Sequence, residues 1–143
     1  MVRPVQILMT YPYLLIALVL IVAGCAAMPQ ANPEIDGNWQ LVSGNVAGQP
    51  LPLVDGHPIT LQVEGSNASG SSACNQYGGS VTVDGSTIAF GDLASTLMGC
   101  EAEVMAAETA YTNALRQVDT ISFDGEDLVL TGPDADLRFM PIG

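Results

Sequence analysis

The sequence predicts an α+β domain that is mostly β, in which a small antiparallel β-barrel-like sheet packs against one amphipathic helix. Three observations support this prediction. Short stretches of alternating apolar and polar residues recur from residue 37 to residue 140, Asp-Gly pairs separate two sets of them, and one alanine- and glutamate-rich stretch has helical periodicity.

The expected strands alternate in polarity, as a sheet with one buried face requires. The first covers residues 37–43 with Trp39 as its largest core side chain, the second covers residues 59–64, and the last covers residues 137–140. Residues 68–73 are rich in Ser and Gly. They predict either a thin strand or a turn region whose small side chains let another backbone approach.

Two hairpins are expected where an Asp-Gly pair lies between alternating stretches. Asp84 and Gly85 connect residues 80–83 to residues 86–90, and Asp124 and Gly125 lie between residues 120–122 and 128–130. An Asp-Gly pair tolerates the positive φ of a type I′ turn, which suits both places.

The helix is expected within residues 100–118, between the two hairpins. Glu101 and Glu103 suit the positive end of its dipole. One apolar stripe would face the sheet. Its members are Val104, Tyr111, Leu115 and Val118, with Ala107 and Ala114 beside them.

The first residues read as a targeting segment. Residues 5–24 carry no charge and are mostly apolar, and they end at Gly24 before Cys25. Small residues before a cysteine at this point resemble a bacterial lipobox, which predicts a lipoprotein signal peptide over residues 1–24, lipid on Cys25 and a flexible tether over residues 25–34. An uncleaved membrane anchor and a plain signal peptide cut near Ala23 are the alternatives.

The charge balance restricts the partners. The chain has no lysine and fifteen acidic residues, and after removal of residues 1–24 only Arg116 and Arg138 oppose those acids, for a formal charge of −13. Such a surface repels nucleic acid. The acids either keep the domain soluble or form an acidic docking face.

The expected partners are the membrane, through lipid on Cys25, and an envelope protein or lipid ligand. The expected location is the cell envelope, on the extracytoplasmic side, which is the outer membrane facing the periplasm in a Gram-negative cell.

Cys74 and Cys100 remain if Cys25 carries lipid, and an even pair in an exported domain predicts a disulfide. Closing a loop of this length stabilises by about 3–4 kcal/mol in the chain-entropy account. Two free, buried cysteines are the alternative. A metal site is poorly supported because only His57 could join them. No cofactor is expected.

Several residues around these cysteines resemble the META domain, the HslJ-like family. Asn75, Tyr77 and Gly78 follow the first cysteine, and a run containing Thr96 and Met98 leads to the second. The resemblance covers a domain of about residues 35–142. Two departures are Gln76, where the family often has a basic residue, and Glu101, where it often has proline. The resemblance implies a barrel-like domain with one helix, often on bacterial lipoproteins and associated with heat-shock expression and novobiocin tolerance.

The leading functional interpretation is a non-enzymatic, lipid-anchored binding or stress-tolerance module. No nucleophile elbow, P-loop or dinucleotide motif occurs in the sequence. An alternative is a pilot- or chaperone-like protein with a groove for an acyl chain or peptide. Leu97, Met98, Met105 and Tyr111 would line that groove. A small exported hydrolase, using His57 or two carboxylates, is a second alternative.

Overall fold

The computed structural model describes residues 35–143, and the predicted signal peptide, the predicted tether and Cys25 lie outside the described residues. Within the described part the fold is α+β and mostly β, as predicted. The elements are β1 (Gly37–Val46), β2 (Gln49–Pro50), β3 (Thr60–Glu64), β4 (Asn67–Ser71), β5 (Gln76–Asp84), β6 (Thr87–Phe90), β7 (Ala94–Ser95), α1 (Ala102–Leu115), β8 (Thr120–Asp124), β9 (Asp127–Gly132) and β10 (Ala135–Ile142).

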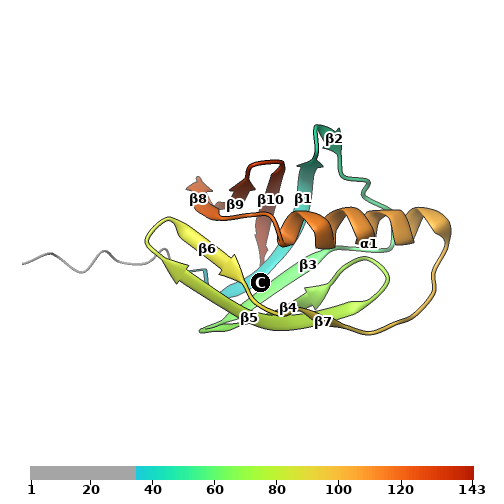
Figure 1. Cartoon of the computed structure of the whole chain (residues 1–143), viewed down its shortest axis with the longest axis horizontal. Coiled ribbons are helices and arrows are strands. Elements are labelled where there is room, and N and C mark those ends of the chain that lie inside the picture. The colour runs from blue at the N-terminus through green and yellow to red at the C-terminus, as the bar shows by residue number, and fades with distance from the viewer. Residues whose placement is uncertain (1–34) are drawn as a thin grey trace, which may run out of the picture.

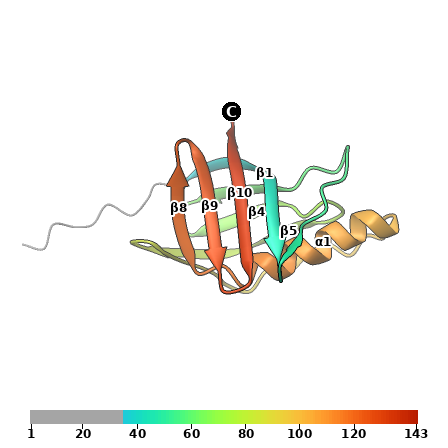
Figure 2. The same ribbon diagram turned by 90° about the horizontal axis from the view of Figure 1, so that it is seen from above.

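The strands form one antiparallel sheet that returns on itself. Its order is β10-β9-β8-β6-β5-β4-β3-β1-β2, and β10 also pairs with β1, so eight strands form a ring. Figure 2 shows β8, β9, β10 and β1 side by side on one part of that ring. The β1–β10 pair is long, with a shift of register between Leu41 and Ser43.

The helix packs across the ring. α1 contacts β1 and β10, and in Figure 1 it lies across the sheet with the loop from β7 curving round to its first turn. The residues predicted to form its apolar stripe are buried. These are Val104, Ala107, Tyr111, Ala114, Leu115 and Val118. They meet inward-facing side chains of the strands, among them Leu61, Leu128 and Phe139, which have no exposed surface.

Several boundaries differ from the sequence prediction. β1 begins at Gly37 as predicted but continues to Val46, and β10 covers Ala135–Ile142, because the two strands pair with each other beyond the predicted segments. β2 and β7 were not predicted, because each has only two residues and shows no alternation of apolar and polar side chains. Of the two alternatives for residues 68–73, the thin strand is the one found, as β4.

The two hairpin turns differ from the expected type I′. Asp84 pairs with Thr87, so the two central residues are Gly85 and Ser86 rather than Asp84 and Gly85. Only Gly85 of these has a positive φ, at 60°, whereas a type I′ turn needs both. The second hairpin repeats this arrangement, with a φ of 65° at Gly125. The Asp-Gly pairs therefore predict the positions of both turns, but the central residues of each turn begin at the Gly, one residue later than predicted.

Candidate functional site

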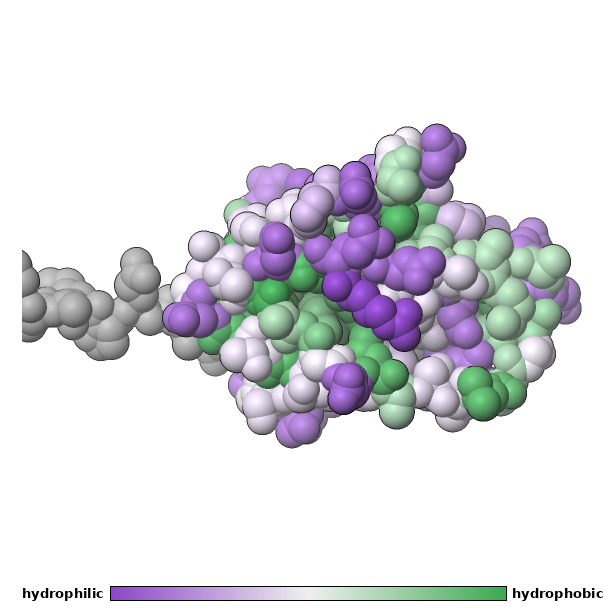
Figure 3. All heavy atoms as spheres, viewed as in Figure 1, coloured by the Kyte–Doolittle hydropathy of each residue, from purple (hydrophilic) through white to green (hydrophobic). Residues whose placement is uncertain are grey.

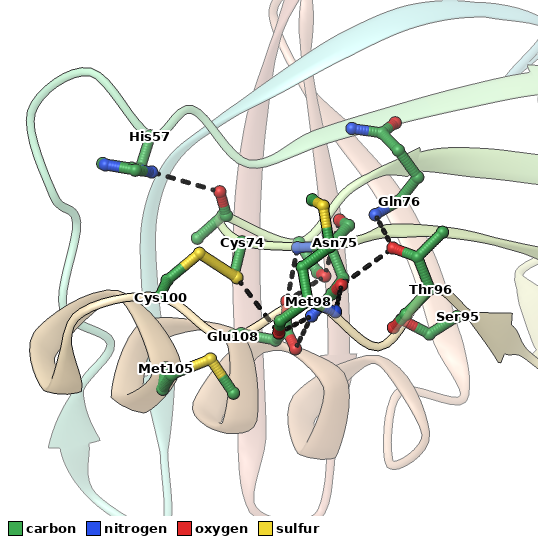
Figure 4. The surroundings of a disulfide bond; sticks show 12 residues. His57, Cys74, Asn75, Gln76, Ser95, Thr96, Met98, Cys100, Met105 and Glu108 are labelled. Atoms are coloured by element: carbon green, nitrogen blue, oxygen red, sulfur yellow. Dashed lines mark hydrogen bonds between the residues drawn. A yellow bond between two sulfur atoms is a disulfide. The ribbon is translucent and has the colours of Figure 1, made fainter.

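The disulfide marks the centre of the candidate site. Cys74 follows β4 and Cys100 precedes α1, and their sulfur atoms are bonded at 2.07 Å. The bond joins the turn between β4 and β5 to the loop that leads into the helix. Figure 4 shows this cross-link beside the Asn75 side chain and above the start of α1.

Asn75 fastens the loop of residues 96–100 to the rest of the domain. Its Oδ1 accepts hydrogen bonds from Thr96 Oγ1 at 2.8 Å and from the backbone N–H of Met98 at 2.7 Å. Its Nδ2 donates to the carbonyl oxygen of Met98 at 3.2 Å and to Glu108 Oε1 at 2.8 Å. A side-chain amide has two donors and two acceptor positions, so all four are used. This buried side chain therefore has no free polar group for a ligand.

Glu108 is the helix residue that receives this network. Its Oε2 accepts from the backbone N–H of Asn75 at 2.7 Å and from the Ser72 hydroxyl at 2.8 Å. Burial raises the pKa of Glu108, but hydrogen bonds from the Asn75 side chain, from Ser72 and from the backbone N–H groups of Asn75 and Cys74 outweigh it, so the pKa is lowered. The carboxylate is thus a charged brace between α1 and the β4–β5 turn.

Glu108 and Ser72 were not among the site residues predicted from the sequence. The signal for Glu108 was present, because residue 108 lies four positions after Val104 and three before Tyr111, on the apolar stripe. A carboxylate on a stripe that faces the core requires buried donors to satisfy it. Ser72 has no comparable pattern, because its role depends on a turn that only the fold reveals.

The turn itself has a strained backbone. Ala73 has a φ of 90°, a left-handed conformation that costs energy for a residue with a β-carbon. The Ser72 N–H donates to the Asn75 carbonyl oxygen at 2.8 Å, which closes the turn around it. The disulfide and the Glu108 bonds hold this conformation from two sides.

A second buried network lies deeper, between Tyr77 of β5 and Tyr111 of α1. Tyr77 Oη is 2.8 Å from the carbonyl oxygen of Thr60 and 2.6 Å from Tyr111 Oη. Because a carbonyl can only accept, Tyr77 donates to Thr60 and Tyr111 donates to Tyr77. Burial raises the pKa of both tyrosines, so both hydroxyls stay protonated at pH values well above those at which tyrosine ordinarily ionises.

The loop that Asn75 holds presents apolar side chains to solvent. Leu97 is 98% exposed and Met98 is 56% exposed. Thr96 is fixed from both sides, since its hydroxyl donates to Asn75 and accepts from the backbone N–H of Gln76 at 3.1 Å. The bracing therefore fixes the backbone of the loop and leaves these two side chains outside.

The groove expected from Leu97, Met98, Met105 and Tyr111 does not form from those residues. Tyr111 is fully buried, whereas Leu97 points to solvent. The physical reason is that Tyr111 lies on the inner face of α1 and is bonded to Tyr77, so it belongs to the core.

His57 lies in the segment between β2 and β3 and is half-buried. Its Nδ1 lies 3.4 Å from the carbonyl oxygen of Ala73, which places the ring near the disulfide (Figure 4). Among the described residues, no three His, Cys, Asp or Glu side chains are grouped so that they could hold a metal ion. No helix of residues 35–143 combines the length and apolar character needed to cross a membrane.

The chain matches the META domain over residues 32–142. The chain belongs to the META domain family. A comparison with curated proteins found no match.

Three solved structures share the fold of this META protein. An NMR structure of a protein from Burkholderia xenovorans is 32% identical, with a TM-score of 0.63, covering 75% of this chain and 82% of that chain. A second NMR structure, with a TM-score of 0.57, is 20% identical over 73% of this chain and 88% of that chain. A crystal structure of a DUF4847 family protein from Bacteroides vulgatus, also with a TM-score of 0.57, is 14% identical over 73% of this chain and 92% of that chain.

Proposed function

We propose that this META protein is a lipid-anchored, non-enzymatic protein of the cell envelope that acts by binding. The observation that carries the proposal is the braced loop of residues 96–100. The polar groups of the Asn75 side chain are all hydrogen-bonded to Thr96, Met98 and Glu108. The side chains that the loop exposes to solvent are Leu97 and Met98. This arrangement suits a recognition element better than a reaction centre.

The anchor in this proposal is lipid on Cys25, on the extracytoplasmic side of the membrane. Support comes from the uncharged segment that ends at this cysteine. The disulfide between Cys74 and Cys100 adds to it, because such bonds persist mainly in oxidising compartments. Nine residues lie between Cys25 and Ile35, so the domain would stay within about 35 Å of the bilayer.

The location is tested by the intact mass of the protein extracted from membranes, with and without reduction before alkylation. The expected mass is that of residues 25–143 plus acyl groups, with no alkylation until the disulfide is reduced. A Cys25→Ser variant should accumulate as the uncleaved chain. A full-length mass for the wild-type protein would refute the lipid anchor.

The physiological part of the proposal is tolerance of envelope stress, as the META resemblance implies. A deletion strain should become more sensitive to heat and to novobiocin, and full-length protein should restore growth where Cys25→Ser does not. Unchanged sensitivity in the deletion strain would reject the stress role. The same strains test a hydrolase alternative, because a His57→Ala variant should complement fully if the protein acts by binding alone.

A further inference from the structure

We propose that the loop of residues 96–100 is a preformed knob that inserts Leu97 and Met98 into an apolar pocket of a protein partner whose rim is basic. This inference rests on the proposed binding function and names the class of partner. It depends on the exposure, the rigidity and the electrostatic surroundings of the loop.

The exposure of Leu97 has no structural explanation within the described residues. The side chain is 98% exposed and Met98 is 56% exposed, although neighbouring Thr96 is tied to Asn75. Residues 93–100 form an uncharged run between Asp92 and Glu101. Single exposed leucines are ordinary. Here, however, an extensive buried network ends in this loop.

The rigidity of the loop favours a pocket over a membrane. Asn75 holds the N–H and the carbonyl oxygen of Met98, and Cys100 is fixed by the disulfide. Insertion into a fluid bilayer needs apolar area but not a fixed backbone shape. Binding to a shaped pocket gains from such preorganisation, because less conformational entropy is lost.

The charges around the loop favour a basic rim on the partner. Glu101 and Glu103 are exposed at the start of α1, and Asp92 is exposed on the other flank. Among the described residues, Arg138 is engaged by Asp124 and Asp127, and Arg116 follows the opposite end of α1, about 20 Å away along a helix of this length. Arg116 instead lines a pocket together with Asp92. Glu101 and Glu103 therefore lack a nearby cation among the described residues, which disfavours anionic headgroups and a second copy of this chain.

The position of the loop also fits a partner away from the bilayer. In Figure 1 the start of β1, which is the first described strand, and the loop before α1 lie on opposite sides of the domain. Figure 3 shows polar and apolar residues interspersed on this face rather than one continuous apolar area. The knob is thus a small anchor with a charged surround, the arrangement of an interface hot spot.

The experiment places a photo-crosslinking benzoylphenylalanine at residue 97 of the full-length protein in its own cells, with the same group at Met140 as control. Met140 is also an exposed apolar residue, at 39%, but lies on β10. The expected product is one protein adduct, specific to residue 97. Its crosslinked peptide should come from an apolar recess with lysine or arginine neighbours.

The identified partner is then purified, and its affinity for variants is measured. Leu97→Ser and the double reversal Glu101→Lys with Glu103→Lys should each raise Kd at least tenfold, while Met140→Ser should not. Binding should weaken with added salt. Unfolding of Leu97→Ser should match the wild-type protein, because the side chain it removes contributes little to the core.

Other outcomes would overturn the inference. An adduct with the mass of a lipid, or Leu97-dependent sedimentation with phosphatidylcholine vesicles, would assign the knob to the membrane. An adduct of twice the chain's mass would assign it to self-association. No adduct, or binding indifferent to salt and charge reversal, would reject a basic-rimmed pocket. None of these results bears on the mass of the lipid anchor, so the two proposals fail separately.

Discussion

At the residue scale, one amide and one carboxylate connect three segments that are distant in sequence. Asn75 joins the β4–β5 turn to the loop of residues 96–100, and Glu108 joins both to α1. Each bond lies in a part-buried site where an unpaired partner cannot be fully satisfied by water. The consequence is that the network should respond to removal of a single charge.

Glu108→Gln should lower the free energy of unfolding by about 1–3 kcal/mol at neutral pH, because the neutral amide accepts less strongly and presents an N–H₂ group to existing donors. Urea unfolding measures this loss. Glu103→Gln, an exposed acid on the same helix, is the matched control and should change stability by only a few tenths of a kcal/mol. Equal losses in the two variants would contradict the bracing role.

The acid dependence of stability should change in the same variant. The folded pKa of Glu108 is lowered, so its contribution is present above the unfolded value of about 4.3 and is lost as the pH falls through the folded pKa. Between pH 7 and pH 3 the free energy of unfolding should therefore decrease less steeply with falling pH in Glu108→Gln than in the wild-type protein. Parallel profiles would show that the carboxylate is not held in its charged form.

The two buried tyrosines should contribute unequally. Tyr77→Phe leaves the Tyr111 O–H without an acceptor and the Thr60 carbonyl without this donor, whereas Tyr111→Phe leaves the Tyr77 bond to Thr60 intact. We expect a loss of about 1–3 kcal/mol for Tyr77→Phe and about 1 kcal/mol or less for Tyr111→Phe. Thermal unfolding of both variants and of the double variant measures the coupling. The reverse order would mean that the direction of donation is wrong.

At the element scale, the close approach of β3 and β4 depends on a missing side chain. An ideal β-carbon at Gly70 would lie 2.1 Å from the carbonyl oxygen of Thr60, which is backbone and cannot swing aside. Tyr77 donates to that same oxygen. The absence of a side chain at Gly70 thus lets the β3 backbone at Thr60 approach β4 closely while its carbonyl oxygen accepts the hydrogen bond from Tyr77.

Gly70→Ala should destabilise the fold by about 3 kcal/mol or more, since relief of the clash must separate two paired strands. Gly99→Ala is the control, because a β-carbon there would meet nothing within 4 Å although Gly99 lies in the braced loop. Differential scanning calorimetry compares the two. A tolerated Gly70→Ala would show that β3 and β4 can move apart at little cost.

The elements differ in how well the sequence foretells them. Alternation identified β1, β3, both hairpins and β10, because each has one buried face, and helical spacing identified the inner face of α1. The tertiary contacts were not predictable in this way. Turn geometry at Gly85, the strained Ala73 and the Glu108 brace arise from pairing partners far away in the chain, which local patterns do not encode.

At the scale of the whole molecule, the ring of strands is closed unevenly. β1 and β10 pair through eight residue pairs, whereas β6 and β8 share only Thr87 with Thr120. Two backbone bonds flank that pair, from Ile88 N–H to Asp119 and from Ile121 N–H to Ser86, at 3.0 and 2.8 Å. This seam joins the β5–β6 hairpin to the β8–β10 part of the ring, so we expect the ring to open there first.

Native-state hydrogen exchange should locate that opening. The amides of Ile88 and Ile121 should exchange at least tenfold faster than the paired amides of β1 and β10, although both side chains are buried. Thr87 and Thr120 lie directly opposite each other between the two bonds, an arrangement whose short Cα separation suits a disulfide. A Thr87→Cys with Thr120→Cys variant, oxidised and verified by mass, should therefore slow exchange at Ile88 and Ile121 and leave the slowest amides of β1 and β10 little changed. If the seam amides of the wild-type protein exchange only with global unfolding, the ring opens as one cooperative unit and the seam has no independent weakness.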